Sequence, residues 1–296
     1  MTISIRALHD DFVGDVSGVD ISHPLGAESI RTIDDAINRY AVLVFHGQSL
    51  DDDQLLAFGR TFGSIAPPRN HRAGHRLQHA EIADISNLNV KNELRARDDH
   101  RRLDSLGNQL WHSDASFRPI SGGLSMLHAH VVPPTGGDTL FADLRAAYDE
   151  LDDETKTLIN GLVAEHSIFN SRGQLGHTDY TDAERAALPA VRHPLVRVHP
   201  GSKRKTLYMG SHASHIIGWQ MPEGRLLLRE LTEHATQKRF VHAHKWQAGD
   251  LVIWDNRCTL HRGARYDDAK YRRDLRRVTT QDMDSASDNP ELVAAG

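Results

Sequence analysis

Apolar residues recur at helical spacing in several stretches of the chain, and these stretches predict helices. One covers residues 30–39, and a second begins at Asp51, where three successive acidic residues suit the positive end of a helix that continues through Phe62. Two more helical patterns lie within residues 142–164. A further helix is predicted at residues 222–235, with a core-facing side made of four leucines: Leu226, Leu227, Leu228 and Leu231.

Short runs rich in β-branched, aromatic and other apolar residues predict strands. They lie at residues 41–45, 124–132, 194–199, 205–210, 238–246, 250–254 and 272–280. Because strands occur on both sides of a helical insertion, the pattern by itself predicts a mixed, β-rich fold.

Two segments lack a clear periodicity. Residues 64–107 are polar and rich in His, Arg and Asn, which fits either a mobile cover over an active site or a solvated connection. Residues 281–296 are predicted to form a flexible tail. No internal repeat divides the chain, so we expect a single domain over residues 1–296.

Composition limits the classes of protein that fit. The chain has 296 residues, of which 39% are hydrophobic, enough for a sizeable core. Its net charge of −5, without a dominant basic stripe, argues against a nucleic-acid-binding surface. Cys258 is the single cysteine, so no internal disulfide can form, which suits a reducing compartment. Residues 1–6 lack the apolar run of a signal peptide, and no stretch approaches the roughly 20 apolar residues that span a membrane, so we expect a cytoplasmic protein.

Candidate metal ligands are found in the segment His112-Ser113-Asp114. A His and an Asp two apart on an extended segment point to the same side of the backbone. His261, from a distant strand-like run, could complete a set of two histidines and one carboxylate. This set occupies one face of an octahedron and leaves open positions, as expected of non-haem Fe(II) oxygenases.

Spacing alone is weak support, because the chain has 20 histidines. His128 and His130 are also two apart in a strand-like run, as are His242 and His244. Neither pair has a carboxylate in a comparable setting, and we interpret both as structural histidines.

Candidate anion-binding residues follow His261 in the chain. On the predicted strand 272–280, Arg273 and Arg277 share a face with Leu275 between them, about 13 Å apart by strand rise. That separation suits two carboxylates, which guanidinium groups bind in bidentate fashion. Taken alone, the segment also fits a solvated strand with alternating charges.

Together these motifs resemble the taurine/2,4-dichlorophenoxyacetate dioxygenase family, and the resemblance runs from about Val13 to Thr280. The motifs that carry it are His112-x-Asp114, Gly136-Gly137-Asp138-Thr139, Trp254-Asp255-Asn256-Arg257 with His261, and Arg272-Arg273-x-x-x-Arg277. The 2,4-dichlorophenoxyacetate branch is more similar than the taurine branch in four passages: residues 83–87, 108–114, 144–149 and 210–215.

The resemblance implies a double-stranded β-helix (jelly-roll) core with flanking and inserted helices. It also implies a catalytic domain that uses Fe(II), 2-oxoglutarate and dioxygen. The substrate would be an aryloxyacetate such as 2,4-dichlorophenoxyacetate, converted to a phenol and glyoxylate while 2-oxoglutarate yields succinate and CO2. We also expect a homo-oligomer.

The resemblance assigns roles to individual residues. His112, Asp114 and His261 would bind iron, while Thr139 and Arg273 would bind the distal carboxylate of 2-oxoglutarate. Substrate-side roles are implied for five residues: Arg277, facing the substrate carboxylate, and Asn108, His199, His212 and His215. The loop after His261 is one residue longer than usual, so alignment by count would choose Arg272. The strand face shared with Arg277 favours Arg273.

Two alternatives stay open from the sequence. The same ligands suit Zn²⁺, so a non-oxidative metal-binding barrel is possible, although Thr139 and Arg273 would then have no purpose. The oxygenase chemistry could also act on a sulfonate, an alkyl sulfate or a cinnamate-like acid, because Arg277 fits each of these anions.

Overall fold

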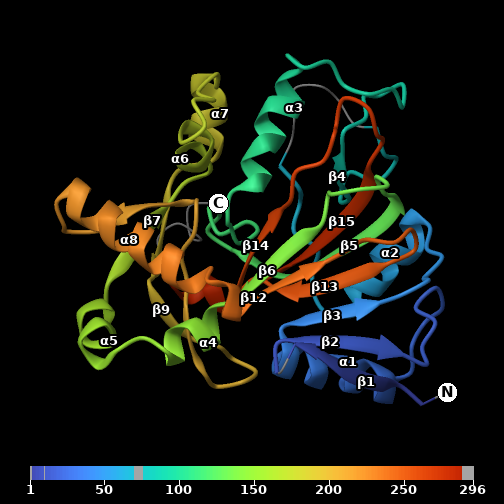
Figure 1. The fold of residues 1–296 in the computed structure, drawn as a ribbon, viewed down its shortest axis with the longest axis horizontal. Coiled ribbons are helices and arrows are strands. Elements are labelled where there is room, and N and C mark those ends of the chain that lie inside the picture. The colour runs from blue at the N-terminus through green and yellow to red at the C-terminus, as the bar shows by residue number, and fades with distance from the viewer. Residues whose placement is uncertain (1, 10, 70–75, 289–296) are drawn as a thin grey trace.

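The largest sheet has seven strands, in the order β1-β2-β3-β13-β5-β15-β4 (Figure 1). The computed structural model describes residues 2–9, 11–69 and 76–288. Within them, β2 and β3 pair in parallel and the other neighbours in this sheet are antiparallel. The strands are β1 Ser4–His9, β2 Val13–Ser17, β3 Val42–Phe45, β4 Ala83–Ser86, β5 Gly122–Val131, β13 Leu251–Asp255 and β15 Asp274–Gln281.

A second sheet, in the order β12-β6-β14, faces the first. Its strands are β6 Thr139–Asp143, β12 Val241–His244 and β14 Thr259–Gly263. Phe141 of β6 contacts Trp254 of β13, with ring centroids 5.4 Å apart, and both lie in one buried cluster with Leu275. The two sheets thus enclose a core as a double-stranded β-helix, and the predicted fold class is confirmed.

The large sheet is covered on its other face by α1 (Ala27–Tyr40) and α2 (Asp52–Arg60). Alternation along the strands explains why both faces are buried. On β3, Leu43 and Phe45 pack with the helices, whereas Val42 and Val44 face the inside of the barrel. Helix α2 begins after Asp51 as predicted, with a capping box between Asp51 and Gln54, and it ends at Arg60 rather than at Phe62.

An insertion between β6 and β12 forms the other side of the molecule (Figure 1). It contains two small sheets, β11-β7-β8 and β10-β9. Its elements are α4 Leu144–Asp149, α5 Asp153–Ile159, β7 Val163–His166, α6 Ile168–Gly173, α7 Asp182–Ala187, β8 Val191–Pro194, β9 Val196–Val198, β10 Lys205–Leu207, β11 Ala213–Ile216, α8 Met221–Ala235 and η2 Lys238–Phe240.

Helix α8 corrects one sequence prediction. Leu227, Leu228 and Leu231 are buried as expected, but Leu226 is 56% exposed. At 3.6 residues per turn, Leu226 falls outside the narrow stripe that its three neighbours form. Within the described ranges, every helix is too short or too polar to cross a lipid bilayer.

In the described parts of the two segments without periodicity, helices and strands are present. Within residues 64–107, β4 pairs with β15 at the sheet edge, and α3 (His100–Ser105) continues into η1 (Leu106–Gln109). The predicted tail is wrong for residues 281–288, because β15 extends to Gln281 and η3 covers Met283–Asp288. Ser285 is fully buried, and its Oγ accepts a hydrogen bond from Ser121 N at 2.9 Å. Residues 70–75 and 289–296 lie outside the described part of the chain.

Candidate active site

A cavity opens at one end of the barrel, with walls from β14, β15 and the start of β6 on one side and from α3 and α6 on the other. It is lined by eight of the ten residues singled out from the sequence: Asn108, His112, Asp114, Thr139, His212, His261, Arg273 and Arg277. Residues 66–69 and 81–87 also line it, so the described part of the segment 64–107 contributes a wall.

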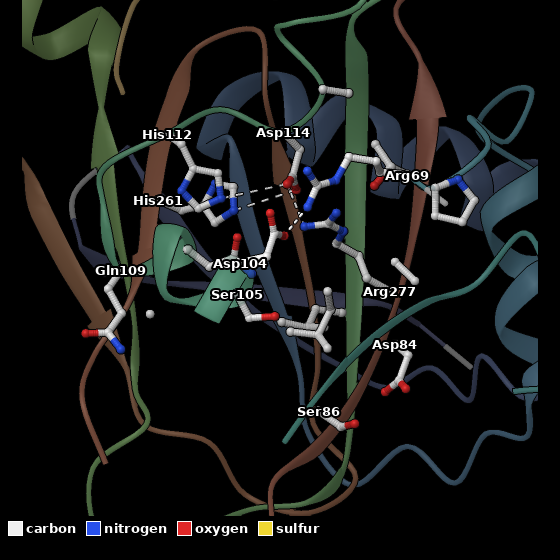
Figure 2. Close-up of a pocket in the computed structure, with 18 of the residues that line it drawn as sticks. Arg69, Asp84, Ser86, Asp104, Ser105, Gln109, His112, Asp114, His261 and Arg277 are labelled. Atoms are coloured by element: carbon white, nitrogen blue, oxygen red, sulfur yellow. Dashed lines mark hydrogen bonds and ion pairs between the residues drawn. The ribbon is translucent and has the colours of Figure 1, made fainter. Parts of the chain in front are cut away.

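Three buried donor groups converge inside this cavity (Figure 2). His112 and His261 are held side by side by paired backbone hydrogen bonds, 3.0 and 2.8 Å long. Asp114 Oδ1 lies 3.9 Å from His112 Nε2, and Asp114 Oδ2 lies 3.6 Å from His261 Nε2. All three ligand atoms lie within 4.8 Å of one another, a separation that one metal ion could bridge.

Hydrogen bonds hold these side chains in orientations that suit a metal. His112 Nδ1 lies 2.8 Å from Leu110 O, so this nitrogen carries the proton and Nε2 presents its lone pair to the cavity. Asp114 N donates to Asn256 Oδ1 at 3.0 Å, and Ser125 Oγ donates to Asp114 Oδ2 at 2.7 Å. Asn256 Nδ2 donates in turn to Ser125 Oγ at 2.9 Å. The Asn of the Trp-Asp-Asn-Arg motif therefore positions the carboxylate.

The charges around the three groups also suit a cation. Burial raises the pKa of Asp114, but its charged neighbours, Arg277 above all, outweigh this effect and lower the pKa to about 2. Burial lowers the pKa of His112 and of His261, and the nearby carboxylate only partly offsets it. The site therefore presents two neutral imidazoles and one carboxylate, the forms in which these side chains bind metals.

Arg273 and Thr139 occupy another part of the cavity. The Arg273 guanidinium lies over the Tyr266 ring, 6.0 Å from its centroid, and Nη2 donates weakly to Gly137 O at 3.4 Å. Thr139 Oγ1 accepts a hydrogen bond from Trp246 Nε1 at 3.0 Å. Gly137 has φ +77°, and a Cβ there would meet the Pro133 ring at 2.9 Å, which explains the second glycine of the loop.

The positions of the arginines at the start of β15 favour Arg273 over Arg272. Arg273 and Arg277 both line the cavity, whereas Arg272 is exposed and does not. Arg276 faces the opposite side of the sheet and pairs with Asp52 at 2.7 Å. Arg277 Nη1 donates to Asp114 Oδ1 at 2.5 Å, while its Nε is buried without a hydrogen-bond partner among the described residues.

Two of the predicted substrate-side residues do not reach the cavity. His199 is buried elsewhere, because its Nε2 pairs with Asp255 Oδ2 at 2.9 Å and its Nδ1 contacts Ser202 Oγ. Asp255 also accepts a bidentate pair from Arg257, so this group is a closed structural network. His215 lies outside the cavity, after a bulge in β11. Its Nδ1 lies 3.8 Å from Glu165 Oε1.

Besides Arg277, the substrate-side residues Asn108 and His212 line the cavity. Asn108 Oδ1 accepts from Arg172 Nη2 at 3.1 Å. The His212 ring meets Phe117, with centroids 5.0 Å apart, and also meets His112. The histidines interpreted as structural have other partners: His128 bonds to Gln48 O, and His244 bonds to Asp250 at 3.1 Å.

A cluster around Asp104 was missed from the sequence. Its carboxylate accepts hydrogen bonds from Arg69 and, at 2.7 Å, from the Tyr180 hydroxyl, and Arg172 Nε lies 3.6 Å away. Figure 2 shows the Arg69 and Arg277 side chains reaching into the same space from one wall. No local motif marks these residues, because they meet only through the tertiary fold.

Comparisons with known proteins agree with this geometry. Residues 4–279 match the family described as taurine catabolism dioxygenase TauD, TfdA family. The chain is 48% identical over 284 residues to an alpha-ketoglutarate-dependent 2,4-dichlorophenoxyacetate dioxygenase of Cupriavidus pinatubonensis, covering 95% of this chain and 99% of the relative. It is 37% identical over 241 residues to an (S)-phenoxypropionate/alpha-ketoglutarate-dioxygenase of Delftia acidovorans, covering 77% of this chain and 78% of that one.

A solved structure is similar over the same length. The crystal structure of AAD-2 in complex with Mn(II) and N-oxalylglycine superposes with a TM-score of 0.90 at 51% identity, covering 95% of this chain and 98% of that one. These similarities decide against the non-oxidative barrel considered from the sequence. The chain belongs to the TauD/TfdA family and is an Fe(II)- and 2-oxoglutarate-dependent dioxygenase.

Proposed function

We propose that the protein hydroxylates an aryloxyacetate such as 2,4-dichlorophenoxyacetate at the carbon between the ether oxygen and the carboxylate. The resulting hemiacetal collapses to a phenol and glyoxylate, and 2-oxoglutarate is converted to succinate and CO2. The observation that carries this proposal is one cavity that joins the His112, Asp114 and His261 donors to two separate arginines, Arg273 and Arg277. The named activities of the relatives agree with it.

In this proposal His112, Asp114 and His261 would hold Fe(II), a donor set typical of non-haem iron oxygenases. The bound iron supplies the activation of dioxygen, coupled to the oxidative decarboxylation of 2-oxoglutarate. Asn256 and Ser125 keep the Asp114 carboxylate in place for the metal. The protein contributes position, because a misplacement of about 1 Å can cost about a hundredfold in rate.

Arg273 and Thr139 bind the distal carboxylate of 2-oxoglutarate. The Arg273 Nε is buried and has no hydrogen-bond partner in the described part of the chain, and its one guanidinium hydrogen bond is long. Burial lowers the pKa of Arg273, so an incoming carboxylate compensates a charge that water solvates poorly.

Arg277 binds the carboxylate of the aryl acid. One side of its guanidinium is bonded to Asp114, and its remaining donors, including the buried Nε, are available to a ligand. This arrangement fixes the substrate carboxylate next to the metal ligands, which brings the adjacent carbon to the reacting centre. Asn108 and His212 form polar parts of the same wall.

A panel of acids tests the proposal. The purified protein is supplied with Fe(II), 2-oxoglutarate and air, and succinate, phenol and glyoxylate are measured together. We expect 2,4-dichlorophenoxyacetate to give phenol and glyoxylate in equal amounts to succinate. Faster coupled turnover of taurine, an alkyl sulfate or a cinnamate-like acid would replace the aryloxyacetate by that class. The cytoplasmic location and the homo-oligomeric state stay predictions.

A further inference from the structure

Arg118 is a cation in the cavity wall that the proposed function does not use. It lies in the turn that follows Asp114, where its backbone N donates to Ala115 O at 3.0 Å. Its side chain lines the cavity and is only half-exposed. The guanidinium carbon lies 5.9 Å from the centroid of the neighbouring Phe117 ring, at the limit of a weak cation–π contact.

The surroundings of Arg118 lack a compensating carboxylate. Among the described residues, no hydrogen bond or ion pair reaches its guanidinium. Burial and the positive charge of Arg69 both lower the pKa of Arg118, and no carboxylate offsets them. The other cavity arginines near the metal ligands differ in this respect, because Arg69 bonds to Asp104 and Arg277 bonds to Asp114.

The proposed ligands do not supply a carboxylate to Arg118. Arg273 is matched by the distal carboxylate of 2-oxoglutarate, and Arg277 by the substrate carboxylate. Asp104 is already shared between Arg69 and Arg172. None of these carboxylates is paired with Arg118, and its half-buried guanidinium donors are well suited to an anion.

The position of Phe117 indicates which part of the substrate meets Arg118. Phe117 is buried in the cavity wall, with the His212 ring edge-on to it and Ile168 lining the same cavity. These surfaces suit the aryl ring of the substrate. Because Phe117 and Arg118 are consecutive and both face the cavity, an aryl ring against Phe117 places its substituents within reach of Arg118.

We propose that Arg118 binds a second anionic group, carried on the aryl ring of the primary substrate. The preferred substrates are then aryloxyacetates with an acidic ring substituent, and Arg118 determines this specificity. The inference rests on the proposed function, since it takes the aryloxyacetate as the substrate scaffold.

The test compares binding of matched ligands without oxygen. Calorimetric titration uses the protein loaded with Fe(II) and 2-oxoglutarate, and the 3- and 4-carboxy isomers of phenoxyacetate against their ring methyl esters. The wild-type protein is expected to bind at least one diacid about tenfold or more tightly than its ester, the size of one charge-assisted hydrogen bond. Arg118→Gln should reduce that ratio to near one, and Arg118→Lys should restore part of it. Arg272→Gln, at an exposed arginine outside the cavity, should leave the ratio unchanged.

Three results would overturn the assignment. The wild-type protein could show no preference for either diacid, or Arg118→Gln could keep the full preference. A third is an equal loss of affinity for diacid and ester in Arg118→Gln, which would mean that Arg118 binds the carboxylate that both ligands share. Oxygen is then admitted to the wild-type samples. If no aryloxyacetate is turned over, the proposed function fails, whatever the binding ratio.

Discussion

Replacing Arg273 by Ala should raise the 2-oxoglutarate concentration required for turnover. The guanidinium faces a partly dry cavity, and its protein contacts are one 3.4 Å hydrogen bond and the Tyr266 ring. Because those contacts contribute little to the stability of the fold, the substitution should weaken 2-oxoglutarate binding rather than destabilise the protein. Leaving one partner of such a charged pair unmatched costs on the order of 2–5 kcal/mol.

The lower end of that range applies here, because the 2-oxo acid end of the ligand is still bound by the metal. A loss of about 2 kcal/mol corresponds to a rise in KM of about thirtyfold. Arg273→Lys keeps the charge but not the planar guanidinium. Its KM for 2-oxoglutarate should therefore lie between those of the wild-type protein and Arg273→Ala. The assay follows succinate formation as 2-oxoglutarate is varied, with thermal unfolding as the check on folding.

Arg272→Ala is the matched control, since Arg272 is the exposed neighbour that alignment by count would have chosen. It should change the KM for 2-oxoglutarate by less than about twofold, in line with a surface substitution. If Arg272→Ala raises KM strongly and Arg273→Ala does not, the reasoning about this strand is refuted.

Three further predictions concern the substrate anchor, the support of the metal site and the response to pH. Arg277→Ala should weaken aryl acid binding by on the order of 2–5 kcal/mol in a calorimetric titration, with a smaller change for 2-oxoglutarate; equal turnover of the acid and its methyl ester by the wild-type protein would remove this anchor. Asn256→Ala leaves the buried backbone N–H of Asp114 without its acceptor, so it should lower the free energy of unfolding by about 1–3 kcal/mol. It should also lower the affinity for Fe(II). If both quantities are unchanged, Asn256 does not position Asp114. Burial lowers the pKa of His166 and brings that of His193 to about 4, so both are neutral when folded. Below about pH 6.5 the unfolded chain binds protons that the folded chain does not, and urea unfolding should show stability falling by about 1.4 kcal/mol per pH unit for each group; higher stability at pH 5.5 than at pH 7 would argue against this.

Spacing in the sequence grouped His112 with Asp114 and Arg273 with Arg277. All four line the cavity, although Asp114 lies in a turn and Arg273 immediately precedes β15, so strand alternation alone does not explain their directions. Helical periodicity likewise located α2 and α8. The pairing of His112 with His261, which brings the third ligand into place, is long-range, so no local spacing records it. His261 was a candidate because of its strand-like run, and the family resemblance added to this.

The remaining features depend on contacts that no local pattern records. Asp104 accepts hydrogen bonds from Arg69 and Tyr180, which lie in different segments of the chain. None of the three residues belongs to a recognisable motif. His215 was expected at the cavity wall, but a bulge of one residue in β11 changes the face of every later side chain. His199 was expected there too, and a buried carboxylate elsewhere holds it.

The central claim is that His112, Asp114 and His261 bind Fe(II) together with 2-oxoglutarate. The most direct measurement is an anaerobic titration with Fe(II) in excess 2-oxoglutarate, followed by the visible absorption of the chelate. The account predicts a band that saturates at one iron per chain and is missing in Asp114→Ala, while the variant keeps the circular dichroism of the wild-type protein. No band in the wild-type protein, or an equal band in Asp114→Ala, would contradict it.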